Sequence, residues 1–148
     1  VAPVAALAGA EEEAPEYHRR YRTYEFKIKN TVDAISHGAC GMAIDIGAKA
    51  IAVCSLSGMT ARMVSRFRSP VDILGVTTSE KTFRKLALSW GVTPVLCEPL
   101  NSTDVLFYRA KQLAKEAFDL RCGDLIVVTG GITNGHSGNT DLIKVEKI

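Results

Sequence analysis

The chain has 148 residues, of which 47% are hydrophobic, and its 18 basic and 16 acidic side chains leave a formal net charge of +2. This size and composition predict one domain with a hydrophobic core. The nearly balanced charge argues against nucleic acid as a partner, and no run approaches the roughly 20 apolar residues of a membrane span.

The first 29 residues contain two segments of different character. Residues 1–16 carry an acidic run and two prolines without helical or strand periodicity, which is typical of a flexible linker or tag remnant. We therefore expect the domain to span 17–148. Residues 17–29 are basic and aromatic, which indicates either a solvated connector whose rings pack on the domain or a contact with another domain or subunit.

A helix is predicted over residues 31–46, with Thr31 as its N-cap and Gly47 at its end. Apolar residues recur at steps of three and four, which predicts a buried stripe. This stripe consists of Val32, Ile35, Ala39, Met42, Ala43 and Ile46. His37 lies in the same helix and is interpreted as a structural residue rather than a base.

From residue 50 onward, short apolar runs alternate with helical patterns. The predicted strands are 50–54, 72–76, 94–97, 125–129 and 142–147, and the predicted helices are 60–67, 80–89 and 103–119. Repeated βα units of this kind predict an α/β fold with right-handed crossovers. The expected architecture is a three-layer sandwich, with a mostly parallel five-stranded sheet between helices on both faces.

Ligands of such folds bind outside the carboxyl ends of the strands, where loops 55–60, 77–79 and 129–141 are expected. The first of these loops combines hydroxyl groups with the backbone N–H groups of a predicted helix start, a cradle suited to a phosphate. Its residues are Ser55, Ser57, Gly58, Met59 and Thr60. Ordinary helix capping explains the same pattern equally well.

The loop after the fourth predicted strand is rich in glycine and small polar residues, which is typical of a ligand flap. The candidate residues are Gly130, Gly131, Asn134, Gly135, His136, Ser137 and Gly138. A tight connection to an edge strand is the alternative. The glycines lead into a strand rather than a helix, so they do not form a dinucleotide-binding fingerprint.

No catalytic or metal-binding constellation stands out. His136 lacks a partner nearby in sequence, and Cys40, Cys54, Cys97 and Cys122 do not have the spacing of metal ligands or redox pairs. We expect all four cysteines to be buried free thiols in a reducing, cytoplasmic compartment. The chain is thus predicted to be a binding domain without a catalytic residue or bound metal.

Several segments together resemble the C-terminal domain of pyruvate kinases, particularly bacterial ones, over roughly residues 17–148. They are Ala34-Ile-Ser-His-Gly-Ala-Cys40, Ser57-Gly-Met-Thr-Ala-Arg62, Ser65-Arg-Phe-Arg68, Ile73-Leu-Gly-Val-Thr77, Gly91-Val-Thr-Pro-Val95, Gly123-Asp124 and Thr129-Gly-Gly131. The resemblance implies an α/β domain with five strands that regulates and assembles the enzyme. The full enzyme transfers phosphate from phosphoenolpyruvate to ADP with Mg²⁺ and K⁺ in a TIM barrel. Because 148 residues cannot contain that barrel, the chain is expected to be an inactive fragment with no cofactor of its own.

The resemblance further implies that fructose 1,6-bisphosphate, other sugar phosphates or AMP bind at the two loops, with Ser55, Ser57, Gly58 and Thr60 around one phosphate. This chain has Leu56 where bisphosphate-responsive relatives often have Lys, and it lacks Trp and Arg in the 129–141 loop. A monophosphate effector, or none, is therefore expected. The resemblance also implies a homotetramer and contact with the catalytic barrel domain, and helix 31–46 and the final strand are candidates for contact between C-terminal domains.

Two other functions are compatible with the residues. The first is a free-standing α/β protein that binds a phosphate ligand. The second is a small phosphohydrolase or phosphotransferase that uses His136.

Overall fold

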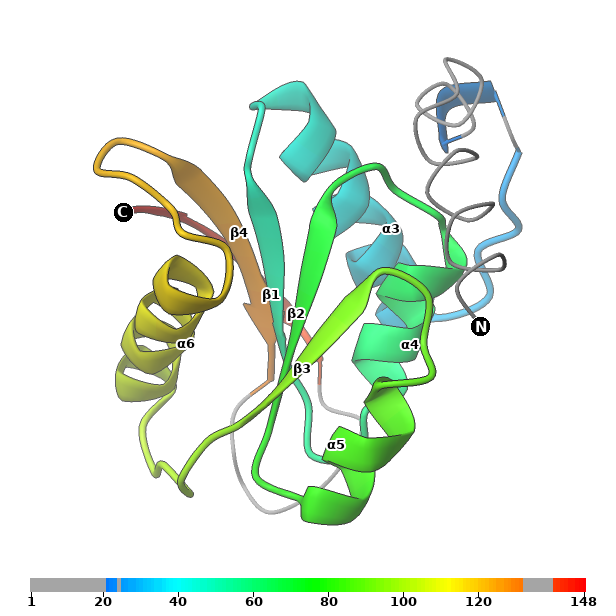
Figure 1. Ribbon diagram of the computed structural model, residues 1–148. Helices are drawn as coiled ribbons and strands as arrows, with labels where there is room; N and C mark the ends of the chain where they lie inside the picture. Colours follow the sequence, from blue (N-terminus) through cyan, green and yellow to red (C-terminus); the bar gives the residue numbers. More distant parts are fainter. Residues whose placement is uncertain (1–20, 24, 132–139) are drawn as a thin grey trace, which may run out of the picture.

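The structure, a computed structural model, describes residues 21–23, 25–131 and 140–148. Its centre is a five-stranded sheet in the order β3-β2-β1-β4-β5, in which only β5 is antiparallel to its neighbour (Figure 1). The strands are β1 (Ala50–Cys54), β2 (Asp72–Thr77), β3 (Val92–Leu96), β4 (Leu125–Gly130) and β5 (Leu142–Lys147). The predicted mostly parallel five-stranded sheet is confirmed.

Helices cover both faces of this sheet, as predicted. The helices are α3 (Thr31–Asp45), α4 (Met59–Arg66), α5 (Glu80–Leu86) and α6 (Thr103–Ala117). Figure 1 shows α6 alone on one face and the other three on the opposite face. The chain therefore forms the expected three layers.

The core has two halves, one on each face of the sheet. Ala52 and Val128 pack toward α6, whereas Val53 and Val127 pack toward α3 and α4. All five residues of β1 are buried, because the strand lies in the middle of the sheet with helices on both sides. The continuous apolar run at 50–54 reflects this position.

The chain crosses from one face to the other between β1 and β4, which are paired neighbours. From β1 it enters α4 on one face, whereas it reaches β4 from α6 on the opposite face. This reversal is a topological switch point, where α/β sheets open a crevice outside the carboxyl ends of the strands. The residues after β1 and β4 therefore lie where a ligand-binding site is expected in such a sheet.

The ends of several predicted helices differ from the structure. The N-cap of α3 is Asn30 rather than Thr31, because the Asn30 side chain accepts a hydrogen bond from the Asp33 N–H at 2.9 Å. The helix predicted over 80–89 ends at Leu86, and the residues after it turn toward β3 through Gly91, whose φ is +64°.

The predicted buried stripe of α3 is partly wrong. Met42 and Ile46 are 36% and 37% exposed, whereas Asp33, Ser36 and Cys40 are buried. Asp33 accepts a hydrogen bond from the Lys29 N–H and lies 3.7 Å from Arg66, so it is buried with polar partners. Contacts outside the helix, rather than its apolar period, determine which face is buried.

The segment before α3 packs on the domain through its rings. Tyr21 is buried, its hydroxyl donates to the His37 carbonyl at 2.6 Å, and its ring stacks on the His37 imidazole. The Phe26 ring meets the Phe67 ring edge-on. For Tyr21 and Phe26 the prediction that the connector packs on the domain is confirmed, whereas residues 1–16 lie outside the described residues.

Candidate functional site

The turn between β1 and α4 is held together by its own backbone and hydroxyl groups. The Ser55 hydroxyl accepts a hydrogen bond from the Gly58 N–H at 3.0 Å, and the more exposed Ser57 hydroxyl accepts one from the Met59 N–H at 3.4 Å. Both hydroxyls of the predicted cradle thus lie at the turn. In this arrangement they bind the N–H groups of Gly58, which is the N-cap of α4, and of Met59, its first residue.

Gly58 is required at the end of this turn for two reasons. Its φ is +76°, in the left-handed region that residues with a Cβ rarely adopt. A Cβ at this position would also lie 2.8 Å from the Thr82 methyl carbon and 3.1 Å from Leu86 Cδ2. The backbone of the turn therefore rests directly on α5.

The Leu56 carbonyl lies on the inner side of the turn. It accepts hydrogen bonds from the Thr82 hydroxyl at 2.9 Å and from the Thr77 hydroxyl at 3.3 Å. Thr77 is the last residue of β2 and Thr82 lies in α5, so two neighbouring elements hold one peptide of the turn. Thr77 belongs to one of the three loops expected at the carboxyl ends of the strands, whereas Thr82 was not among the predicted residues.

Thr60, the remaining hydroxyl of the predicted cradle, lies beneath the turn. It is 3% exposed, and its Oγ1 atom lies 2.5 Å from Oγ1 of Thr140, which is 6% exposed. This hydrogen bond joins the first turn of α4 to the residues before β5. The two predicted loops therefore meet here, although Thr140 was not among the predicted site residues.

Of the predicted loop after β4, the structure describes only the beginning. Gly130 is buried, and a Cβ there would lie 3.1 Å from Cys54 Cβ, so glycine permits the close approach of β4 to the end of β1. Gly131 is half-buried. The other predicted residues, Asn134, Gly135, His136, Ser137 and Gly138, lie outside the described residues.

The backbone N–H groups at the start of α4 contribute partial positive charge at this turn. The first turn of α4 has no acidic side chain, so the partial positive charge of its N-terminus is not offset there. Leu56 and Met59, each 48% exposed, occupy the tip of the turn, and residues 55–60 include no Lys or Arg. Such a turn suits an anion bound by N–H groups and hydroxyls.

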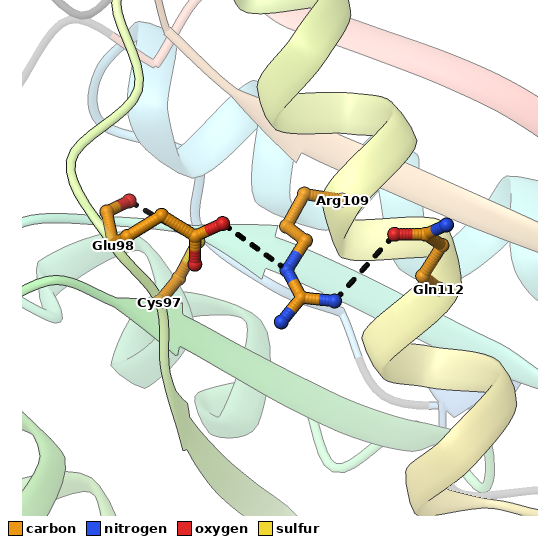
Figure 2. Close-up of polar contacts among 4 residues, drawn as sticks. All are labelled: Cys97, Glu98, Arg109 and Gln112. Carbon is orange, nitrogen blue, oxygen red and sulfur yellow. Dashed lines mark hydrogen bonds and ion pairs between the residues drawn. The ribbon is translucent and has the colours of Figure 1, made fainter.

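A second polar cluster follows β3, as Figure 2 shows. The Cys97 thiol donates to the carbonyl and carboxylate oxygens of Glu98, whose Oε1 lies 3.5 Å from Nε of Arg109, and Arg109 in turn donates to Gln112. Burial raises the pKa of the Cys97 thiol, so the group stays protonated at neutral pH. The cluster therefore joins the residue after β3 to α6 without presenting an activated nucleophile.

The cysteines agree with the prediction at three of four positions. Cys40, Cys54 and Cys97 are buried free thiols, whereas Cys122 is exposed, contrary to the prediction. Cys122 lies between Arg121 and Gly123, which are both exposed as well, so this turn is at the surface. Within the described ranges, no three His, Cys, Asp or Glu residues gather as a metal site would require.

Comparison with known proteins identifies relatives of the whole α/β unit. Residues 33–146 match the family model described as pyruvate kinase, alpha/beta domain. The pyruvate kinase of Clostridium acetobutylicum is 43% identical over 120 residues, which cover 81% of this chain and 25% of that protein. The pyruvate kinase of Staphylococcus epidermidis is 36% identical over 138 residues, which cover 92% of this chain and 24% of that protein. The chain thus spans about a quarter of the length of the relatives it matches.

Proposed function

We propose that this chain, which belongs to the pyruvate kinase family as its C-terminal α/β domain, regulates and assembles a pyruvate kinase. In the full enzyme it would adjoin the catalytic barrel, which performs the glycolytic transfer of phosphate from phosphoenolpyruvate to ADP. The chain itself would be inactive, since that reaction and its Mg²⁺ and K⁺ belong to the barrel. Its own ligand would be a phosphorylated effector.

The observation that carries the effector proposal is the meeting of two loops at the switch point. The turn at 55–58 leads into a helix whose own first turn has no acidic side chain, and the Thr60–Thr140 hydrogen bond draws the second loop against it. Because the turn offers N–H groups and hydroxyls without a cation, it suits the single phosphate of a sugar monophosphate or AMP better than a bisphosphate. Residues Ser55, Ser57, Gly58, Met59 and Thr60 would form one wall, and the loop from Gly130 to Gly138 would form the other.

The experiment is a thermal-shift titration of the 148-residue chain. Ligand that binds only the folded state raises the melting temperature by mass action. We expect larger shifts with fructose 6-phosphate or AMP than with fructose 1,6-bisphosphate, and we expect Ser57→Asp, at an exposed position of the turn, to remove the shift by repelling the anion. If no phosphate compound shifts the melting temperature at millimolar concentration, the effector proposal is wrong.

We further propose that the domain self-associates through β5. The two edge strands, β3 and β5, are each paired on one side only and so have unpaired backbone groups on the other side. β3 includes Pro94, which lacks an N–H donor, whereas β5 has no proline. Val145 in β5 is 43% exposed. An antiparallel pair of β5 strands with Val145 opposite Val145 of the partner subunit would place each Lys144 opposite a Glu146, which favours that register.

Sedimentation of the chain tests this assembly. Glu146→Lys should weaken association because two lysines then face each other across the pair, and the double variant Lys144→Glu, Glu146→Lys should restore it. Association that is insensitive to both changes would exclude this register. Lys85→Glu on α5, an exposed position of a helix that packs on β2 and β3, is the control.

The proposed compartment is the cytoplasm. The buried free thiols at Cys40, Cys54 and Cys97 suit a reducing environment. In the part of the chain that the structure describes, no helix has the length and apolar content needed to cross a bilayer. This assignment follows the proposed role in glycolysis.

A further inference from the structure

The peptide bond between Leu56 and Ser57 lies at the tip of the turn, yet its carbonyl is held from inside. The carbonyl oxygen accepts hydrogen bonds from two hydroxyls, those of Thr82 at 2.9 Å and Thr77 at 3.3 Å. Thr77 and Thr82 are 2% and 7% exposed, whereas Leu56 is 48% exposed. Two buried donors from other elements therefore converge on one backbone acceptor of an exposed turn.

The orientation of this carbonyl determines the direction of the next N–H group. The described residues have no cis peptide bond, and in a trans peptide the C=O and N–H bonds point in opposite directions. With the Leu56 carbonyl directed toward β2 and α5, the Ser57 N–H is directed away from them, to the outer side of the turn. If the peptide rotated by half a turn, it would present a carbonyl oxygen there instead.

The two orientations differ in their effect on an anion. An outward N–H donates to a phosphate oxygen, whereas an outward carbonyl repels it, and no Lys or Arg in residues 55–60 would compensate. We propose that Thr77 and Thr82 are positioning residues that lock the Leu56–Ser57 peptide in the orientation that accepts an anion. The orientation stands on the hydrogen bonds alone, whereas its consequence for binding rests on the proposed effector site.

Thr82 is the better of the two residues to test. The Thr77 hydroxyl also accepts from the Ser79 N–H at 3.2 Å, so its removal would disturb the start of α5 as well. Thr82→Val removes the hydroxyl and keeps the shape, whereas Thr82→Ser keeps the hydroxyl and removes the methyl group that lies under Gly58. Thr93→Val, at an exposed position of β3, is the matched control for loss of a threonine hydroxyl.

The first measurement needs no ligand. Residual dipolar couplings report the direction of the Ser57 N–H bond in the 148-residue chain. We expect the native chain, Thr82→Ser and Thr93→Val to agree, and Thr82→Val to show a reoriented or averaged Ser57 N–H. An unchanged Ser57 coupling in Thr82→Val would overturn the proposal.

The second measurement uses inorganic phosphate, titrated by the shift in melting temperature. Thr82→Val should weaken phosphate binding by about tenfold, while Thr82→Ser and Thr93→Val bind like the native chain. Equal binding by Thr82→Val and the native chain would contradict the positioning role. If the native chain itself binds no phosphate, the effector site is wrong, and the couplings alone decide whether the two threonines orient the peptide.

Discussion

Gly58→Ala tests most directly whether the turn packs on α5. Its expected loss of folding free energy has two separate causes. The left-handed backbone, at φ +76°, costs an alanine about 1–2 kcal/mol. The new Cβ, at 2.8 Å from the Thr82 methyl and 3.1 Å from Leu86, adds overpacking of about 1–3 kcal/mol. We expect the free energy of unfolding to fall by about 2–5 kcal/mol.

Urea denaturation of the chain measures this loss, with Gly91→Ala as the matched control. Gly91 has φ +64° and no atom within 4 Å of its built Cβ, so it carries the backbone strain without the overpacking. For a urea slope of about 2 kcal/mol per molar, the midpoint should fall by about 1–2.5 M for Gly58→Ala and by about 0.5–1 M for Gly91→Ala. Equal midpoints for the two variants would refute the packing of the turn on α5.

Three further predictions concern charge and protonation. Leu56→Lys adds a cation at the exposed tip of the turn and should tighten the binding of fructose 1,6-bisphosphate by about tenfold in a thermal-shift titration. Leu88→Lys, at a side chain that is 92% exposed in another region, should leave this binding unchanged. Asp33→Asn removes a buried carboxylate from the first turn of α3 and should lower the free energy of unfolding in urea by about 1–2 kcal/mol, with the exposed Asp45→Asn as control. Burial raises the pKa of the Cys40 and Cys54 thiols from 9.0 to about 12. Between these pH values both thiols stay protonated in the folded chain, whereas they ionise in the unfolded chain. The free energy of unfolding should therefore decline as pH rises from 9 toward 12, and urea midpoints that do not change over this range would contradict the burial of the two thiols.

The sheet could be predicted from the sequence because its signals are local. Ala50–Cys54 and Leu125–Gly130 are short apolar runs between polar turns, and strands buried on both faces require that composition. The buried face of α3 could not be predicted in the same way. Asp33 is buried because Lys29 and Arg66 provide it with partners, and Arg66 belongs to another helix. An apolar period cannot indicate such a partner, so Met42 and Ile46 were placed in the core instead.

The candidate site shows the same division between local and distant information. The spacing of Ser55, Ser57 and Gly58 indicates a capped turn, because those residues satisfy one another across two or three positions. The role of Thr60 depends on Thr140, which lies 80 residues later, and that of Leu56 depends on Thr82, 26 residues later. Sequence spacing therefore predicts that a helix begins here, whereas only the fold determines which groups remain for a ligand. The hydroxyls of Ser55 and Thr60 and the N–H groups of Gly58 and Met59 already have protein partners. An anion at this turn would therefore depend chiefly on other backbone N–H groups such as that of Ser57, and the orientation of the Leu56–Ser57 peptide then becomes decisive.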